Sequence, residues 1–209
     1  MSEAYKSPEP QVSRELRAQG KRTRQRLLSA ATDVFAERGY HSARVDDIVR
    51  AARTSHGTFY LYFANKQEVL LALAVECAQE LQLLVDELAV VADGGAQADS
   101  VGEWLQRFIA VYGEFGPIIR AWMENQVADR ETNLLGVEVF TAIASGLAKC
   151  IRATGGDASP VAVGALMAML ERYSYFVASG RVSAPTPEES AAFIRTVYRG
   201  FFDVTAIPA

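Results

Sequence analysis

The chain of 209 residues has few of the side chains on which catalysis and metal binding depend. It contains only two histidines, His41 and His56, and neither has a cysteine or a carboxylate at the spacing of metal ligands. The sequence shows no glycine-rich phosphate loop and no set of Ser, His and Asp typical of a hydrolase. We therefore expect a protein that is not an enzyme and that needs neither a metal nor a cofactor.

Cysteines are equally scarce, because Cys77 and Cys150 are the only two and they lie far apart within apolar helical patterns. We interpret both as small core residues of a reducing compartment rather than as a disulfide or a redox pair. The sequence has no uninterrupted run of 18 apolar residues, and its start from Met1 to Gly20 is too polar for a signal peptide. These features predict a cytoplasmic protein without a membrane span.

No segment shows the alternation of a β-strand, whereas apolar residues recur at helical spacing along most of the chain. Half of the residues are hydrophobic, which is enough for a sizeable core. The pattern predicts an all-α fold with about nine helices. Gly116 and Pro117 are expected to end one helix and to begin the next, which would run to about Asp129.

Charge is unevenly distributed along the chain. Residues 1–66 carry 12 Lys and Arg against 7 Asp and Glu, whereas residues 67–209 carry 9 against 18. A basic N-terminal third on an acidic remainder is typical of a protein whose one end meets phosphate, although a solvated charged face would give the same count. Residues 1–20 are expected to be a flexible basic arm, and a strong helix is predicted from Thr23 to Arg38, with Gly39 as its terminator.

The stretch from Ser42 to Leu70 reads as two short helices joined by a tight turn and followed by a longer helix. Val45, Ile48, Val49 and Ala52 give the first helix an apolar face. Thr54 or Ser55 can cap the second, which turns two phenylalanines inward. Asn65 and Glu68 form a capping box for the third. Two short helices around such a turn are the helix-turn-helix motif, whose second helix enters the major groove of DNA.

The outward side of the second short helix favours DNA contact over simple helix packing. Its side chains are short hydroxyls and rings, which reach phosphates and base edges without long mobile stems, and a lysine follows at a helix N-terminus. The predicted DNA-binding residues are Arg44, Thr54, Ser55, His56, Thr58, Tyr60, Tyr62 and Lys66. Two packing helices with incidental polar groups, as in a protein–protein adaptor, remain the alternative.

These residues resemble the TetR family of bacterial transcriptional regulators. The resemblance is carried by Leu28-x-Ala30-Ala31-x-x-x-Phe35-x-x-x-Gly39-Tyr40, Val45-x-x-Ile48 and Gly57-Thr58-Phe59-Tyr60-x-Tyr62-Phe63-x-x-Lys66-x-x-x-Leu70. It covers the first third of the chain and implies a recognition helix at Ser55–Phe63, with phosphate contacts at Tyr60 and Lys66. The chain departs from the family where Arg53 replaces a usual glycine, so an arginine would occupy a left-handed position at a cost of about 1 kcal/mol.

The resemblance also implies a division into a helix-turn-helix domain at residues 21–66 and a ligand-binding and dimerisation domain at residues 67–209. Family members dimerise through their last two helices, where Gly164, Ala165 and Ala168 would permit close approach and Phe193, Ile194, Val197, Tyr198 and Phe201 would supply apolar contacts. Aromatic and Met-rich middle helices predict a small hydrophobic effector, although such stripes also form ordinary cores. The predicted ligand-binding residues are Trp104, Phe108, Tyr112, Trp122, Met123, Gln126, Phe140, Met167, Tyr173 and Phe176.

The function expected from the sequence is that of a ligand-responsive, homodimeric DNA-binding regulator. It would be a repressor that a hydrophobic small molecule releases from a palindromic double-stranded operator. The alternatives are a transcriptional activator of the same fold and a helical protein–protein adaptor that binds no DNA.

Overall fold

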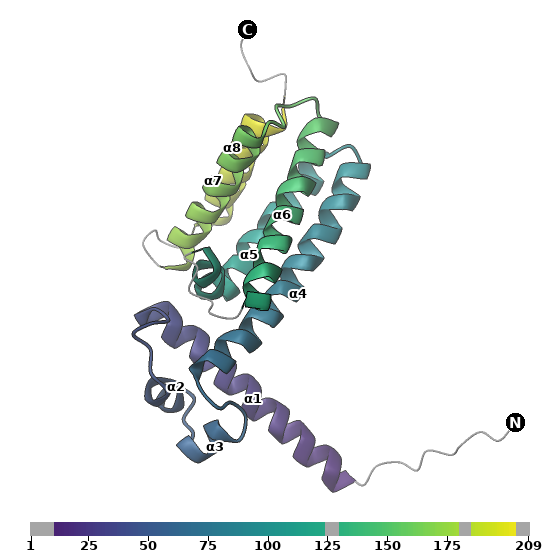
Figure 1. Ribbon diagram of the computed structural model, residues 1–209. Coiled ribbons are helices and arrows are strands. Elements are labelled where there is room, and N and C mark those ends of the chain that lie inside the picture. Colours follow the sequence, from purple (N-terminus) through teal and green to yellow (C-terminus); the bar gives the residue numbers. More distant parts are fainter. Residues whose placement is uncertain (1–10, 124–129, 180–184, 204–209) are drawn as a thin grey trace, which may run out of the picture. The chain divides into compact units, whose positions relative to one another are not determined.

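A computed structural model of the chain describes residues 11–123, 130–179 and 185–203, without the side chains of residues 11–16, 123, 131 and 132 (Figure 1). Within these ranges the chain forms helices and no strand, which confirms the predicted all-α fold. The chain divides into two compact units, Met1–Val69 and Leu70–Ala209. The helices are α1 (Gln11–Arg38), α2 (Val45–Ala51), α3 (His56–Tyr60), α4 (Lys66–Asp93), α5 (Ala98–Met123), α6 (Arg130–Ala153), α7 (Pro160–Ala178) and α8 (Pro187–Phe201).

The first unit is a small helical head in which α1 packs against α2 and α2 packs against α3. Its buried apolar side chains come mainly from the faces that the periodicity predicts, and they include Leu27, Leu28, Ala30, Ala31, Val34, Phe35, Ile48, Val49, Ala52, Phe59 and Phe63. Phe59 and Phe63 contact each other at a centroid distance of 5.9 Å. Two large rings from one short segment therefore fill a core that the short helices α2 and α3 could not fill with aliphatic residues alone.

Helix α1 is longer than the sequence predicted, because it begins at Gln11 rather than at Thr23. The segment from Gln11 to Gly20 that we expected to belong to a flexible arm is therefore helical. It contains no proline, and its Gln, Glu, Leu, Arg and Ala residues favour a helix enough to outweigh the cost of Gly20, about 1 kcal/mol. The rest of the predicted arm, residues 1–10, lies outside the described residues.

The other end of α1 is where the sequence placed it. Gly39 has φ 75°, and its N–H donates a hydrogen bond to the carbonyl of Phe35. A side chain would strain this left-handed position, so glycine ends the helix at little cost and turns the chain toward α2.

The second unit is built around α5, which packs against α7 and α8 and also contacts α6 (Figure 1). Helix α4 joins this unit through polar contacts that the sequence could not reveal. The indole Nε1 of Trp104 donates to the carbonyl of Leu84, and the thiol of Cys150 donates to the carbonyl of Leu88. Cys77 and Cys150 are both buried and unpaired, in agreement with their predicted place in the core.

Pro117 does not separate two helices, as we predicted, but lies inside α5. It removes one backbone hydrogen bond and crowds the preceding turn, which costs about 3 kcal/mol in a helix interior. The apolar stripe of α5 nevertheless continues on both sides of it, since Phe115, Ile118 and Ile119 are all buried. Burial of these side chains offsets the cost, so the described residues contain eight helices rather than the predicted nine.

One close helix contact in the second unit depends on a glycine. A Cβ atom on Gly146 of α6 would lie 2.8 Å from Cδ1 and 3.0 Å from Cβ of Leu88 on α4. Both distances are too short for carbon atoms, and only one of the two atoms is at the flexible end of the leucine. Any side chain at position 146 must therefore push α4 and α6 apart.

We predict that Gly146→Ala lowers the free energy of unfolding by about 1–3 kcal/mol through this overpacking. Gly113→Ala on α5 is the matched control, because a Cβ there meets nothing within 4 Å. It should stabilise the protein by about 0.5–1 kcal/mol, the usual gain when alanine replaces glycine in a helix. Urea unfolding of both variants measures the difference, and equal stabilities would contradict the contact between α4 and α6.

Candidate nucleic-acid interface

The turn between α2 and α3 adopts the geometry of a helix-turn-helix. Arg53 has φ 49°, so the predicted left-handed position is confirmed and an arginine holds it. The N–H of Arg53 donates to the carbonyl of Arg50, and the N–H of Thr54 donates to the carbonyl of Val49 at 3.1 Å. These bonds close the end of α2 and compensate for the strain of an arginine with positive φ.

Ser55 is the residue that starts α3. Its backbone is extended (φ −97°, ψ 157°), and its Oγ accepts a hydrogen bond from the N–H of Thr58 at 3.1 Å. The same Oγ lies 2.9 Å from Oγ1 of Thr58. The hydroxyls of Ser55 and Thr58 are both predicted to contact DNA, and that of Ser55 also caps the helix that presents them, which fixes the position of both side chains.

The side of α3 away from the core is open to solvent. Tyr60 is 57% exposed and stands edge-on to the buried Phe59, which anchors the helix below it. The other predicted contact residues differ in exposure: Arg44, Ser55 and His56 are exposed, and Thr54, Thr58 and Tyr62 are half-buried. Their contact with DNA remains a prediction, which this exposure supports.

Lys66 does not point outward as we expected. Its Nζ donates hydrogen bonds to three backbone carbonyls, those of Tyr40 at 2.8 Å, His41 at 3.0 Å and Ala43 at 2.9 Å. The ammonium also lies 4.7 Å from the centre of the Tyr40 ring, and partial burial lowers the pKa of Lys66. All three donors of the ammonium are thus used inside the head, where they tie the loop after α1 to the start of α4.

Two features of this surface were not predicted from the sequence. Asp46 lies in the first turn of α2, and its Oδ1 is 2.8 Å from Nε2 of His56. Leu61, directly after α3, is 80% exposed beside Tyr60 and can supply an apolar contact. The sequence already shows that Leu61 lies outside the apolar stripe of Phe59 and Phe63. It does not show that Asp46 and His56, ten positions apart, form a hydrogen bond.

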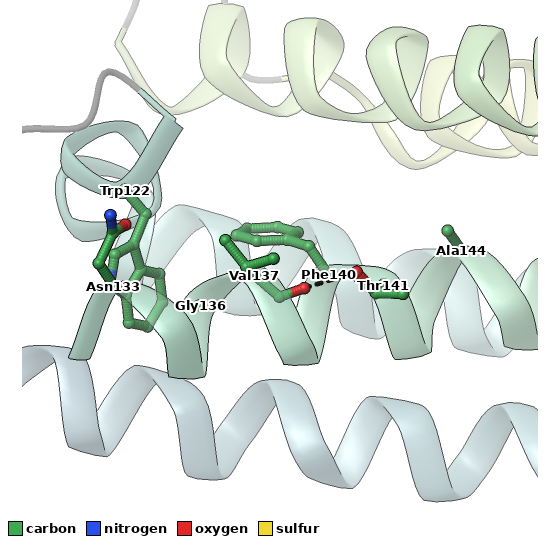
Figure 2. Close-up of a pocket in the computed structure, with 7 residues that line it drawn as sticks. All are labelled: Trp122, Asn133, Gly136, Val137, Phe140, Thr141 and Ala144. Carbon is green, nitrogen blue, oxygen red and sulfur yellow. Dashed lines mark hydrogen bonds between the residues drawn. The ribbon is translucent and has the colours of Figure 1, made fainter. Parts of the chain in front are cut away.

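The second unit holds a hollow along α6, next to the end of α5, with a volume of about 450 Å³. Figure 2 shows Trp122 from α5 at one end of it and Val137, Phe140 and Ala144 along α6. The rings of Trp122 and Phe140 meet edge-on at a centroid distance of 6.3 Å. The indole Nε1 of Trp122 is buried and has no hydrogen-bond partner among the described residues. This volume is within the usual range for small-molecule sites.

The predicted ligand-binding residues do not all come together at this hollow. Only Trp122 and Phe140 line it. Trp104, Phe108 and Tyr112 are core residues that are at most 3% exposed, and Tyr112 donates a hydrogen bond to Glu171 at 2.8 Å. Met167, Tyr173 and Phe176 belong to α7 and do not line the hollow. The side chain of Met123 and the whole of Gln126 lie outside the part of the chain that the structure describes.

Residues 27–73 match the family described as bacterial regulatory proteins, tetR family. Among relatives, the fatty acid metabolism regulator protein of Bacillus subtilis is 44% identical over 50 residues, or 24% of this chain and 26% of that protein. The uncharacterised HTH-type transcriptional regulator YdgC of Bacillus subtilis is 31% identical over 88 residues, or 42% of this chain and 44% of that protein. The chain thus spans less than half the length of these relatives.

Solved structures extend the likeness to the fold of nearly the whole chain. The fatty acid degradation regulator FadR from Bacillus halodurans superposes with a TM-score of 0.59 at 19% identity, over 86% of this chain and 94% of that one. PfmR, a TetR family regulator from Thermus thermophilus, gives a TM-score of 0.63 at 18% identity, over 82% and 93%. These matches show that the helical head and the helical body share the fold of those structures. Residues 27–73 therefore form a domain of the TetR family of bacterial regulatory proteins.

We predict that Lys66→Ala lowers the free energy of unfolding of the head by about 1–3 kcal/mol, because it leaves the carbonyls of Tyr40, His41 and Ala43 without their partner. Lys21→Ala, at an exposed position of α1, should change it by less than about 0.5 kcal/mol. Urea unfolding compares the two lysines, which carry the same charge. Equal effects would show that the Lys66 hydrogen bonds contribute no stability.

Proposed function

We propose that the protein is a homodimeric DNA-binding transcription regulator, a repressor that a hydrophobic small molecule releases from a palindromic operator. The observation that carries the proposal is the exposed, Ser55-capped helix α3 within a helix-turn-helix of the TetR family. Helix α3 enters the major groove, and the hydroxyls and rings on its open side contact base edges and phosphates. Exposed cations of α1 add attraction to the backbone, and they include Lys21, Arg22 and Arg26.

The dimer forms through α7 and α8. Helix α7 is apolar, yet only 22% of an 18-residue stretch of it is buried within the chain. Its open side carries Val161, which is 81% exposed, and the small residues Gly164, Ala165 and Ala168. A solvent-exposed apolar helix of this kind is stabilised when a second copy covers it, and small residues let the two backbones approach closely.

The part of α8 that joins this interface differs from the part that the sequence suggested. Ile194 and Val197 are buried inside the chain, Phe193 stacks on Tyr173 at 3.6 Å, and Tyr198 donates a hydrogen bond to the carbonyl of Ala96. The predicted apolar contacts of α8 thus belong largely to the core of one chain. The exposed residues left for a partner on α8 include Ala192, Thr196 and Gly200, spaced four apart on one side of the helix.

The effector occupies the hollow along α6. Its lining is mainly apolar, with Asn133 and Thr141 as the polar exceptions, and Thr141 already donates to the carbonyl of Val137 at 2.7 Å. The Nε1 of Trp122, which lines the hollow with its ring, is a buried donor without a partner among the described residues. A hydrophobic molecule that carries a single hydrogen-bond acceptor fits this chemistry.

Release from DNA follows from a coupling between the two sites. Helix α4 begins in the first unit and continues into the second, so a displacement of α4 reaches the head. Effector binding shifts α4 and changes the separation of the two recognition helices, which must match major grooves about 34–36 Å apart or a multiple of that. A coupling of about 1–3 kcal/mol changes DNA affinity about 5–150-fold.

The protein works in the cytoplasm, where its DNA is. Helices Asn133–Ala153 and Pro160–Ala178 are long and apolar enough to cross a membrane by length and composition alone. The dimer interface and the effector site account for that composition, because they lie on α7 and α6 respectively.

A transcriptional activator of the same fold and a protein–protein adaptor are the competing functions, and DNA binding separates the adaptor from both regulators.

The dimer proposal makes a prediction about one exposed alanine. Ala168→Arg on α7 should convert the dimer to a monomer, because it places a charge and a long side chain where two backbones meet. Ala110→Arg is the matched control, since Ala110 is exposed on α5 and outside the proposed interface. Sedimentation of both variants measures the oligomeric state. A dimeric Ala168→Arg variant would place the interface elsewhere.

The regulatory function is tested by binding of the purified protein to DNA upstream of its own gene, across a salt series. We expect saturable binding to a palindromic site, with affinity that falls as salt rises, and relief of binding by one member of a hydrophobic compound library. The same compound should fail to release Ala144→Trp, because Ala144 lines the hollow and a larger side chain there occupies the space that the compound needs. Absence of DNA binding at any salt concentration would favour the adaptor.

A further inference from the structure

We propose that Asp46 is a positioning residue that fixes the imidazole of His56, so that His56 reads one base of each half-site through Nδ1 alone, with a preference that changes with pH. This inference rests on the proposed DNA-binding function and deepens it. It assigns a specificity-determining role to a residue pair that joins the two helices of the motif.

The geometry of the pair supports this role. Nε2 of His56 lies 2.8 Å from Oδ1 of Asp46, and both side chains are well exposed, at 57% and 66%. Asp46 belongs to the first turn of α2, and His56 is the first residue of α3. N-terminal residues of a recognition helix are the ones that contact base edges. A carboxylate on a DNA-binding surface repels phosphate and therefore weakens binding. The presence of Asp46 on this surface is explained if its carboxylate orients the ring of His56 toward a base.

The chemistry of the pair fixes which nitrogen is free. An ionised carboxylate can only accept a hydrogen bond, so Nε2 of His56 must carry the hydrogen. Nδ1 has no hydrogen-bond partner in the described part of the chain. The ring is therefore held by one nitrogen and presents the other one to whatever approaches α3.

The free nitrogen has two states with opposite hydrogen-bonding character. In the neutral ring Nδ1 is an acceptor, which suits the amino group of cytosine or adenine in the major groove. In the protonated ring it is a donor, which suits N7 or O6 of guanine. One side chain can therefore favour different bases in its two protonation states.

The charged groups around the pair leave His56 as the group that changes. Asp46 is close to Arg44 and Arg50 on its own side, and its pKa is held below the usual value chiefly by the hydrogen bond from His56. Asp46 therefore stays ionised in both protonation states of His56. The neighbouring Asp47 is committed elsewhere, since it accepts the N–H of Arg44 and lies 3.7 Å from Arg38 of α1. Within α3 the other ionisable side chain is that of Tyr60.

The experiment selects bound sequences from a random DNA library at pH 6 and pH 8, with the full-length protein. We expect the wild type to change its preference at one position of each half-site, from cytosine or adenine at pH 8 to guanine at pH 6, by about fivefold, the value of one hydrogen bond. His56→Asn should show one preference at both pH values, because its side chain does not titrate. Asp33→Ala, an exposed aspartate of α1, is the control and should behave as the wild type.

Asp46→Ala separates a positioning role from a merely structural one. Without the carboxylate the ring turns freely, so discrimination at that position should fall about fivefold at both pH values. Affinity for unrelated DNA should rise at the same time, because a charge that repels phosphate has been removed. A variant that had only lost stability would lose affinity for both kinds of DNA.

The outcomes distinguish the inference from the proposed function. Specific binding by the wild type with the same base preference at both pH values would overturn the role of Asp46 and His56 and leave DNA recognition intact. Unchanged discrimination in Asp46→Ala would overturn the positioning role in the same way. Absence of any sequence-specific binding by the wild type at either pH would overturn both proposals.

Discussion

The hydrogen bonds of the Lys66 ammonium are the interactions on which the head depends. The ammonium binds three carbonyls in the loop that connects α1 to α2, and these carbonyls cannot find partners within either helix. The loop sets the entry of α2, and α2 with its left-handed turn at Arg53 sets the entry of α3. One cation at the start of α4 therefore determines the orientation of the surface that is proposed to read DNA. A core of few residues could not hold that orientation by burial alone.

Local signals explain why much of the head was predictable from the sequence. Ser55 caps α3 and Gly39 ends α1 through hydrogen bonds to residues at most four positions away. The spacing of Val49, Phe59 and Phe63 indicates which side of each short segment is buried. The errors arose where a long-range interaction decided the outcome. Pro117 reads locally as a helix break, but burial of the residues beside it keeps α5 continuous, and Lys66 reads as a surface cation until its carbonyl partners are known.

The same contrast applies to the candidate sites in the second unit. Aromatic residues at helical spacing cannot be divided into core and cavity by sequence, because both are apolar and both recur every three or four residues. Trp104 and Trp122 show this, since both are buried indoles of α5. Trp104 donates its hydrogen bond to Leu84, whereas Trp122 lines the hollow with its donor unpaired among the described residues. Only the partners of the indole nitrogen tell them apart, and those partners come from other helices.

Pro117 has a mechanical consequence for this helix. The ring nitrogen cannot donate to the carbonyl one turn earlier, so α5 lacks a rung of its backbone ladder about two-thirds of the way along. Bending stiffness is lowest where a rung is missing. The part of α5 before Pro117 carries the core contacts of Trp104 and Tyr112, and the part after it carries Trp122. The wall of the hollow thus follows a turn of α5 that lacks one backbone hydrogen bond, and the buried side chains of Ile118 and Ile119 hold that turn in place.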